Sequence, residues 1–466
     1  MKAETLPREI FRAYDVRGIV GEQLTEETAT LIGSALATKA LAVGVRRLAI
    51  GRDGRQSSPS LAQALATGIN QAGLDTIDIG LCPTPALYWA ACELAEGNGA
   101  MVTGSHNPVQ YNGIKMMLGG SALAGDEIQQ LFLLITEKRL TSRRGGAGEH
   151  SSNSQIIDSY LADLLAGRSL ARPVRVVVDC GNGAAGPLAP AALERLGCEV
   201  VPLYEQVDGT FPNHHPDPAD PKNFADAIAA MDREQAEMAI AFDGDGDRIG
   251  VALPGSGIIY PDRMLMALAR DFLAANPGEK IVYDVKCSRL VGDFIAERGG
   301  TPVMCRTGHS FVKQEMEKSA ARLGGELSGH MFFHEGRWRF DDALLAAVKL
   351  AVLAAGHESA TELFTQIPDA PASPEIKIDL PAESPPPAEL VEELLANPGF
   401  ASAPEKIITI DGLRAEWPDG FGLVRASNTT KSLIMRFEGD CTQSLARIHN
   451  EFSDRLKQLG LVLPAP

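Results

Sequence analysis

The stretch VRVVVDCGNG at residues 174–183 decides the fold, because a β-branched apolar run ends there in a glycine-rich turn. A helical segment closed by glycine follows at 187–197, and then a second apolar run, CEVVPLYE, at 198–205. Apolar runs of this length predict buried strands. A helix between two such strands predicts a βαβ unit with parallel strands.

Two further segments repeat this pattern of strand, turn, helix, glycine and strand. One covers residues 47–80, from RLAIGRDGR to LDTIDIG, and the other covers 280–306, from KIVYDVKCS to TPVMCR. Each helix is expected to have about three or four turns. Because more than 100 residues separate the copies, a solenoid is excluded. The sequence therefore predicts three α/β domains of similar topology.

The last hundred residues break the pattern. Residues 367–387 are rich in proline, which is typical of a linker or a domain edge. Three strand-like runs and a helical tail at 441–460 follow, and they predict a smaller α+β domain hinged on this joint. The expected domains are 1–150, 151–256, 257–368 and 369–466.

Composition excludes several classes of protein. The chain has 466 residues, of which 45% are hydrophobic and 22% charged, as in ordinary globular proteins. Its formal net charge of −17 disfavours non-specific binding to nucleic acid or anionic membranes. The N-terminus has no apolar signal segment, and the most apolar helical stretch, Ala343–Ala355, is too short to span a bilayer. Seven cysteines without a CxxC motif indicate reduced core residues of a cytoplasmic protein.

An acidic loop gives the clearest chemical signal. Asp243, Asp245 and Asp247 alternate with glycine at the end of an apolar run. Three hard oxygen ligands suit Mg²⁺ or Ca²⁺ better than zinc. An EF-hand is excluded because its twelfth position, which requires glutamate, is Pro254. A solvated acidic turn is the alternative interpretation, although three close carboxylates repel one another.

Three other loops carry polar groups in patterns that also fit ordinary turns. In TGSHNP (103–108), glycine and Asn-Pro predict a tight turn that exposes the Ser105 hydroxyl. No Gly-x-Ser-x-Gly elbow is present, so Ser105 is expected to carry a group and not to attack an acyl carbon. GELSGH (325–330) offers partners for sugar hydroxyls, or is a helix–strand turn. RASNTT (425–430) offers a phosphate cradle, or is a polar hairpin.

Two further clusters are candidates for ligand contacts. RAYDVRG (12–18) places an aromatic ring and two guanidinium groups near the N-terminus. Lys286 and His309 follow the two strands of the third repeat. Ligands of open α/β sheets bind outside the carboxyl ends of strands, which favours these two positions.

A competing interpretation rests on one motif. Residues 181–186 fit GxGxxG between a strand and a helix, with Glu199 or Glu205 as the ribose acid, as in a nicotinamide-dependent oxidoreductase. That function would leave the acidic loop, Ser105 and the RASNTT segment without a role. The same glycines can also form a short βα turn.

Taken together and in this order, TGSHNP, DGDGDR, GELSGH and RASNTT resemble the α-D-phosphohexomutase superfamily, most closely its bacterial phosphomannomutase/phosphoglucomutase branch. The resemblance implies three similar α/β domains with mixed sheets plus a smaller, hinged C-terminal α+β domain around a central cleft. It also implies reversible interconversion of hexose 1-phosphate and hexose 6-phosphate, through a phosphoserine and a 1,6-bisphosphate. Mg²⁺ is the expected cofactor, and glucose 1,6-bisphosphate the activator or intermediate. A cytoplasmic monomer is expected, whose partner is a phosphosugar and neither nucleic acid nor membrane.

The resemblance also assigns residues by matching position. Ser105 corresponds to the phosphoserine and, with Asp243, Asp245 and Asp247, to the metal ligands. The expected catalytic residues are Ser105, Lys115, His330 and Arg17, with Lys115 and His330 as candidates for the general acid and base. The expected substrate contacts are Tyr14, Arg248, Lys286, His309, Glu326, Ser328, Arg425, Ser427, Asn428 and Thr429.

One departure from the family concerns the phosphate loop, and one loop residue bears on the substrate. Lys431 stands where the family often has proline, which removes a fixed φ and adds a cation. The third loop reads GELSGH and not the GEQSGH associated with the glucosamine branch. A phosphoglucosamine mutase and a catalytically silent sugar-phosphate-binding protein stay open as alternatives.

Overall fold

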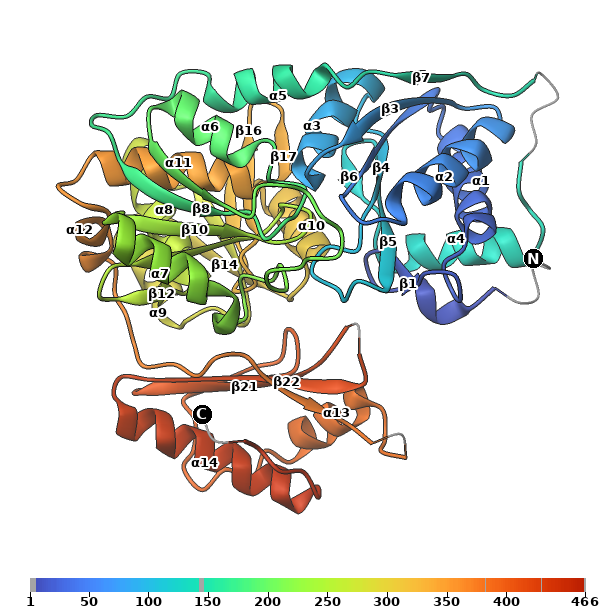
Figure 1. Ribbon diagram of the computed structural model, residues 1–466. Coiled ribbons are helices and arrows are strands. Elements are labelled where there is room, and N and C mark those ends of the chain that lie inside the picture. The colour runs from blue at the N-terminus through green and yellow to red at the C-terminus, as the bar shows by residue number, and fades with distance from the viewer. Residues whose placement is uncertain (1–5, 142–145, 382, 429, 465–466) are drawn as a thin grey trace. The chain divides into compact units, whose positions relative to one another are not determined.

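The computed structural model describes residues 6–141, 146–381, 383–428 and 430–464. These residues form two compact units (Figure 1). Unit 1 lies within Met1–Leu268 and Arg322–Gln366, and unit 2 within Ala269–Ala321 and Ile367–Pro466.

The first sheet of unit 1 is mixed and has the strand order β1-β5-β4-β2-β3-β7, with β6 paired to β5. Strand β2 runs parallel to β3 and β4, which confirms the first predicted βαβ unit, whereas β5 runs antiparallel to β4 and β1. The elements of this region are the 3₁₀ helix η2 (Arg8–Ile10), β1 (Val16–Ile19), α1 (Glu26–Ala42), β2 (Arg47–Arg52), α2 (Ser58–Gln71), β3 (Asp75–Leu81), α3 (Thr84–Ala95), β4 (Gly99–Val102), β5 (Tyr111–Leu118), β6 (Ser121–Ala122), α4 (Asp126–Thr136) and β7 (His150–Ser152).

Helices α1 and α2 pack against each other through glycines (Figure 1). A Cβ at Gly33 would overlap the carbonyl oxygen of Leu65, and a Cβ at Gly68 would overlap that of Thr30. The two helix backbones can approach this closely only because neither glycine carries a side chain.

The second sheet of unit 1 has the order β12-β11-β10-β8-β9, with β8 parallel to β9 and β10. Its region comprises α5 (Ile156–Leu165), β8 (Arg175–Asp179), α6 (Ala189–Leu196), β9 (Glu199–Leu203), the 3₁₀ helix η3 (Pro221–Phe224), α7 (Ala225–Glu234), β10 (Met238–Phe242), β11 (Ile249–Leu253) and β12 (Gly257–Ile259). Helix α8 (Pro261–Ala275) follows, and the last residue of this part of unit 1, Leu268, lies within it. Helix α6 has 8 residues, or about two turns, so the expectation of three or four turns is wrong here. Turns occupy the preceding residues, and Gly197 in the left-handed region ends the helix.

Three antiparallel strands and two helices complete unit 1. They are β15 (Leu323–Gly325), β16 (Met331–Glu335), β17 (Trp338–Asp341), α11 (Ala343–Ala355) and α12 (Ala360–Thr365). Helix α11 has the predicted bounds, because the Asp342 carboxylate accepts a hydrogen bond from the Leu345 N–H and caps its first turn. The GELSGH segment connects β15 to β16, so it is a strand–strand turn and not a helix–strand turn.

Unit 2 contains the third βαβ repeat and the C-terminal sheet. The parallel pair of strands in the repeat confirms the prediction, but α9 again has only 8 residues because Gly299 and Gly300 follow its end. The sheet order is β18-β22-β21-β20-β19. The elements are β13 (Lys280–Asp284), α9 (Leu290–Glu297), β14 (Thr301–Cys305), α10 (His309–Ser319), β18 (Ile376–Asp379), α13 (Pro387–Ala396), β19 (Lys406–Ile408), β20 (Leu413–Trp417), β21 (Gly420–Ala426), β22 (Ser432–Gly439) and α14 (Thr442–Gln458).

The proline-rich segment 367–387 is more than a linker. Its residues Ile376–Asp379 form the edge strand β18, which pairs antiparallel with β22. Proline is tolerated beside an edge strand because one side of that strand needs no ladder hydrogen bonds.

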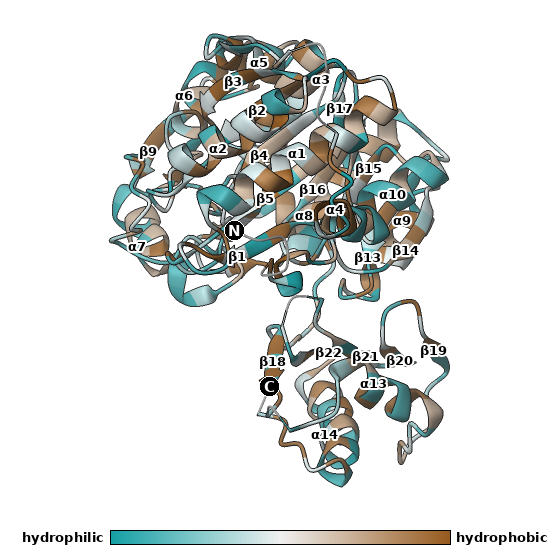
Figure 2. Ribbon diagram, turned by 90° about the vertical axis from the view of Figure 1, so that its right-hand side faces the viewer, coloured by the Kyte–Doolittle hydropathy of each residue, from teal (hydrophilic) through white to brown (hydrophobic). Residues whose placement is uncertain are grey.

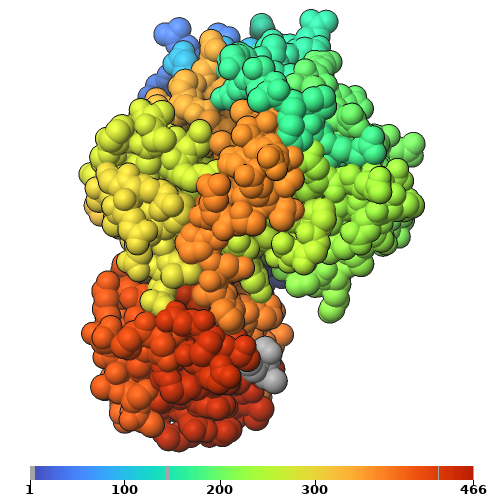
Figure 3. Space-filling model, turned by 90° about the vertical axis from the view of Figure 1, so that its left-hand side faces the viewer, coloured from blue at the N-terminus to red at the C-terminus, as the bar shows by residue number. Residues whose placement is uncertain are grey.

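Two buried arginines join the parts of unit 2, whose yellow and orange-red atoms adjoin in Figure 3. Arg414 Nη1 donates to the carbonyl oxygens of Val285 at 2.6 Å and Cys287 at 2.7 Å. Arg436 Nη1 donates to that of Lys286 at 2.9 Å. The loop after β13 is thereby fixed to the C-terminal sheet.

The C-terminal helix α14 buries its apolar residues against the sheet of unit 2. Helix α14 carries both brown and teal residues in Figure 2, and its apolar Ile448, Phe452 and Leu456 are buried against β21 and β22.

All seven cysteines are free, and five are buried. Cys441 is exposed at the start of α14, so the expectation of core cysteines is wrong there, and Cys92 is half-buried. None of the helices in the described ranges combines the length and apolarity needed to cross a membrane.

Candidate active site

Ser105 lies in the serine loop (residues 103–111), which connects β4 to the antiparallel β5. The prediction that its hydroxyl is exposed is wrong, because Ser105 is only 2% exposed. Its Oγ donates to Asp243 Oδ2 at 2.7 Å, and its backbone N–H donates to Thr103 Oγ1 at 2.8 Å. The φ of +47° places Ser105 in the left-handed region, which a residue with a side chain occupies only when its surroundings hold it there.

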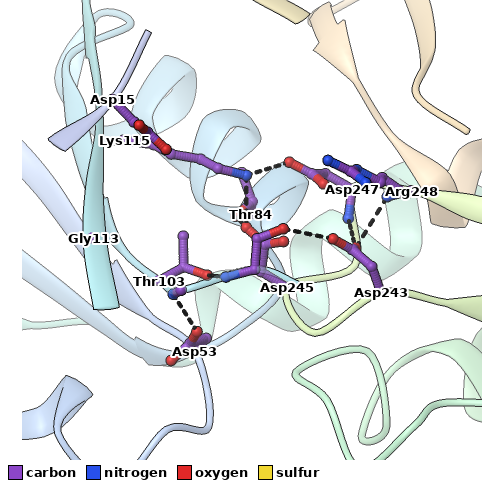
Figure 4. Close-up of polar contacts among 12 residues, drawn as sticks. Asp15, Asp53, Thr84, Thr103, Gly113, Lys115, Asp243, Asp245, Asp247 and Arg248 are labelled. Carbon is purple, nitrogen blue, oxygen red and sulfur yellow. Dashed lines mark hydrogen bonds and ion pairs between the residues drawn. The ribbon is translucent and has the colours of Figure 1, made fainter. Parts of the chain in front are cut away.

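The acidic loop (residues 243–247) connects β10 to the antiparallel β11 and faces the serine loop (Figure 4). Asp243, Asp245 and Asp247 are all buried, and one oxygen of each lies within 4.8 Å of the others. The backbone N–H groups of Asp247 and Arg248 donate to Asp243 Oδ1 at 3.1 and 3.2 Å. A Cβ at Gly244 would overlap the carbonyl oxygen of Ser105, so glycine there permits the close approach.

Lys115 and Thr84 support the carboxylates. Lys115, in β5, places Nζ 2.7 Å from Asp245 Oδ2 and 2.5 Å from Asp247 Oδ2. Thr84, the first residue of α3, donates from Oγ1 to Asp245 Oδ2 at 2.6 Å. Lys115 and Thr84 thus bind two of the three carboxylates, and the Ser105 hydroxyl binds the third, Asp243.

The donor set fits a hard divalent cation. Oδ1 of Asp245 and Oδ1 of Asp247 are buried without a hydrogen-bond partner in the described part of the chain. Burial, together with the charges of Asp245 and Asp247, raises the pKa of Asp243 well above its ordinary value. Burial lowers the pKa of Lys115, but the neighbouring carboxylates outweigh it and hold the pKa well above its ordinary value. Carboxylate oxygens with unused lone pairs are the ligands that Mg²⁺ prefers.

Guanidinium and imidazole groups surround the hydroxyl. Arg17, in β1, donates to the carbonyl oxygen of Gly104 at 2.6 Å and pairs with Asp15. Arg248 lies at one end of the acidic loop, where its Nη2 is 3.5 Å from Nε2 of His106. Burial, followed by the charges of Arg248 and Arg17, lowers the pKa of His106 well below its ordinary value.

The hydrogen bonds fix the tautomers of both histidines, because arginine can only donate. His106 Nε2 accepts from Arg248, so Nδ1 carries the hydrogen and points to Ser105 Oγ at 3.2 Å. His106 consequently cannot take the proton of Ser105, in agreement with the exclusion of a hydrolase elbow. His330 Nε2 accepts from Arg248 Nε at 3.1 Å, and its Nδ1 lies 2.8 Å from Asp341 Oδ2.

The GELSGH loop packs on the strand that follows the acidic loop. The backbone N–H of Ile249 donates to the carbonyl oxygen of Gly329 at 3.1 Å. Ser328 Oγ donates to Glu326 Oε2 at 3.3 Å, and Glu326 is buried. Tyr14 is half-buried, and burial, followed by the charge of Asp15, raises the pKa of its hydroxyl.

The remaining predicted residues lie in unit 2. Lys286 follows β13 and pairs with Glu375 at 2.7 Å, and the buried His309 begins α10. Arg425, at the end of β21, donates from Nε to Asp411 Oδ2 at 2.9 Å. Asn428 Nδ2 donates to the carbonyl oxygen of Thr307 at 3.2 Å, which brings the RASNTT segment to the loop before α10.

Ser427 is half-buried and Thr430 N–H donates to its Oγ at 3.2 Å. The segment is the hairpin between β21 and β22, which is compatible with both interpretations of RASNTT. Thr429 lies outside the described residues.

Family models match the chain in four consecutive parts. They are phosphoglucomutase/phosphomannomutase α/β/α domains I, II and III, over residues 8–141, 158–256 and 260–370, and the C-terminal domain of the same family, over 375–455. The chain belongs to the phosphoglucomutase/phosphomannomutase family. The resemblance seen in the four loops is confirmed, as are three α/β domains with mixed sheets and a smaller C-terminal domain. The exact limits of the four predicted domains stay predictions.

Two named relatives and one solved structure match this chain over almost its whole length. A phosphoglucomutase of Neisseria meningitidis is 46% identical over 449 residues, which is 96% of each chain. A phosphomannomutase/phosphoglucomutase of Pseudomonas aeruginosa is 45% identical over 466 residues, or 100% of this chain and 99% of that protein. A crystal structure of a phosphoglucomutase/phosphomannomutase family protein from Burkholderia thailandensis superimposes with a TM-score of 0.91 at 42% identity, covering 98% of both chains.

In this family member the glycines of residues 181–186 serve packing. A Cβ at Gly183 would lie 2.9 Å from the carbonyl oxygen of Gly244, and one at Gly186 would overlap that of Glu205. The N–H of Ala184 donates to the Gly244 carbonyl at 3.0 Å. The turn that contains these glycines packs against Gly244 of the acidic loop. Close packing therefore accounts for the GxGxxG pattern without a dinucleotide.

Several residues of the site were not predicted from the sequence. They are Asp15, Asp53, Arg55, Thr84 and Asp341. Each contacts a residue of a predicted loop or cluster through a hydrogen bond or an ion pair. Two stretches offered a signal: RAYDVRG includes Asp15, and RDGR, which includes Asp53 and Arg55, places charged residues at the carboxyl end of a parallel strand.

Proposed function

We propose that the chain is a phosphohexomutase that reversibly interconverts hexose 1-phosphates and hexose 6-phosphates, through a phosphoserine at Ser105. The observation that carries this proposal is the buried hydrogen bond of 2.7 Å from the Ser105 hydroxyl to Asp243. The family membership and the printed names of the relatives support mannose and glucose phosphates as substrates.

Asp243, Asp245 and Asp247 would hold Mg²⁺, with an oxygen of the phosphorylated Ser105 as a further ligand. When bound, the ion withdraws charge from the phosphoryl group and lowers the cost of transferring it. With the ion bound, Lys115 would give up the two carboxylates that it now bridges, which frees its side chain to act near the transferring group.

Arg17 and Arg248 are assigned to the equatorial oxygens of the phosphoryl group, since phosphoryl transfer depends mainly on charge stabilisation and position. Lys115 and His330 are the candidates for moving the proton of the sugar hydroxyl. Asp341 would support His330 in this role, because its Oδ2 lies 2.8 Å from Nδ1 while Nε2 accepts from Arg248.

In the reaction, the Oγ–P bond of phospho-Ser105 breaks while a bond forms from phosphorus to the hydroxyl oxygen of a hexose monophosphate, whose proton passes to the base. The 1,6-bisphosphate formed must turn so that its other phosphoryl group returns to Ser105. Glu326 and Ser328 are assigned to hydroxyls shared by glucose and mannose. Arg425, Ser427, Asn428 and Thr429 are assigned to the non-reacting phosphate, and Tyr14, Lys286 and His309 to substrate contacts.

The test uses Ser105→Ala with Ser60→Ala as the matched control, because Ser60 is an exposed serine on α2. Turnover of glucose 1-phosphate should fall by several orders of magnitude in Ser105→Ala and stay unchanged in Ser60→Ala. Intact-mass spectrometry of wild type after incubation with glucose 1,6-bisphosphate should show one added phosphoryl group on Ser105. Near-normal turnover by Ser105→Ala would refute the proposal.

The preferred sugar follows from kcat/KM on mannose 1-phosphate, glucose 1-phosphate and glucosamine 6-phosphate. A preference for glucosamine 6-phosphate would replace the proposed substrates with those of a phosphoglucosamine mutase.

A further inference from the structure

One arginine, Arg55, donates hydrogen bonds to several backbone carbonyls of the serine loop. Arg55 follows β2, and its side chain is 1% exposed. Its Nη2 donates to the carbonyl oxygens of Ser105 at 2.8 Å and Asn107 at 2.5 Å. Its Nη1 donates to those of Pro108 and Tyr111, both at 2.9 Å. A planar guanidinium with fixed donors therefore sets the positions of four carbonyls in seven residues.

Asp53 holds the other side of the same loop. Its Oδ2 accepts from the N–H of Gly104 at 3.0 Å, next to the serine. Its Oδ1 accepts from the N–H of Arg55 at 3.0 Å and from Ser58 Oγ at 2.5 Å. With its Oδ2 also 3.4 Å from Arg55 Nε, Asp53 fixes both the arginine and the loop.

The surrounding chain is shaped to fit this guanidinium. A Cβ at Gly104 would overlap the Arg55 side chain, although Gly104 has no positive φ, so the close approach alone requires glycine there. From the second sheet's region, Phe211 lies with its ring centre 5.2 Å from the guanidinium carbon, and Gly209 packs on the Arg55 backbone. These contacts exclude water and strengthen the hydrogen bonds.

We propose that Arg55 is a positioning residue for phosphoryl transfer, which keeps the Ser105 oxygen beside Asp243. The inference rests on the proposed function. Ser105 adopts a left-handed backbone conformation that does not persist without support, and Arg55 supplies that support at the Ser105 carbonyl itself. A shift of about 1 Å in a reacting group can reduce the rate about 100-fold. Arg55 touches neither the sugar nor the phosphoryl group in this role, so its loss should affect kcat and leave KM nearly unchanged.

The test compares Arg55→Ala and Arg55→Lys with the control Arg172→Ala. Arg172 also donates to backbone carbonyls of unit 1, those of Ala354 and His357. These carbonyls lie at the end of α11, away from the serine loop. Both Arg55 variants should lose about 100-fold in kcat for glucose 1-phosphate with little change in KM. Lysine should not restore the rate, because an ammonium cannot reach four carbonyls in one plane. Arg172→Ala should keep the kcat of wild type.

A second measurement separates positioning from a loss of folding. Guanidinium ion, added below the concentration that unfolds the protein, should restore part of the kcat of Arg55→Ala and none of that of Ser105→Ala. Phosphorylation of Ser105 by glucose 1,6-bisphosphate, followed by intact mass, should slow in the Arg55 variants by the same factor as kcat.

Two results would overturn the inference: wild-type kcat in either Arg55 variant, or a loss explained by the unfolded fraction and not relieved by guanidinium. Both presuppose an active wild type. A wild-type chain without any hexose phosphate turnover would instead contradict the proposed function and this inference with it.

Discussion

Replacement of Thr84 by valine tests the acidic loop as a metal site through a residue that would not touch the metal. The Thr84 hydroxyl donates to Asp245 Oδ2 at 2.6 Å, and both side chains are fully buried. The Thr84 backbone N–H also donates to the Asp245 carbonyl at 2.8 Å, and this bond stays in the variant. Valine therefore removes one hydrogen bond to the carboxylate and little else.

The expected effect can be derived in two ways. A hydrogen bond to a charged group contributes about 1.5–3 kcal/mol. Loss of a group that orients a metal ligand reduces metal affinity about 10- to 100-fold, which is about 1.4–2.8 kcal/mol at 1.4 kcal/mol per tenfold change. Because the two ranges agree, we expect the Kd for Mg²⁺ to rise about 10- to 100-fold in Thr84→Val.

The assay is titration of Mg²⁺ by calorimetry, together with the Mg²⁺ concentration that gives half-maximal turnover. Thr76→Val is the matched control, since Thr76 is also fully buried and bonded through Oγ1, to Asn70 at 3.2 Å, but lies in β3 away from the carboxylates. The control should bind Mg²⁺ like wild type. An unchanged Kd in a folded Thr84→Val protein would refute the assignment of Asp245 as a ligand.

Two further predictions concern stability. Gly33→Ala gains about 1 kcal/mol in helix propensity, but its Cβ meets the backbone carbonyl of Leu65, which cannot yield as a side chain could. Overpacking of about 1–3 kcal/mol should dominate, so Tm should fall; a higher Tm would show that α1 and α2 can separate freely. Arg414→Met leaves the carbonyls of Val285 and Cys287 without these donors, which should cost about 3 kcal/mol. Urea unfolding should show a lower midpoint, and an unchanged midpoint would mean that water replaces the guanidinium without cost.

The local sequence pattern was sufficient to predict a helix or strand where that segment alone determines its structure. The parallel pair β8 and β9 follows from β-branched runs that must be buried on both faces. Helix α11 has the predicted bounds because its apolar residues and its Asp342 cap act within a few positions. Helices α6 and α9 are shorter than predicted because glycines and turns compete with the helix at their ends.

The convergence of the three carboxylates of the acidic loop could also be predicted, since alternating glycines let the backbone bend tightly between them. The burial of Ser105 could not be predicted, because the tight turn that suggested an exposed hydroxyl packs against a loop 138 residues away. The contacts of Thr84 and Arg55 could not be predicted for the same reason. Threonine and arginine are common residue types, and only their partners show what they do.

The sequence by itself determined the strands and helices, the order of the four loops and the family, because these depend on residue types at short and regular spacings. Only the tertiary structure decided which groups meet. Lys115 reaches Asp245 across 130 positions and Thr84 reaches it across 161, since adjacent sheets bring their connecting loops together. Contacts at such separations depend on how the sheets pack, and no local pattern of side chains encodes that packing.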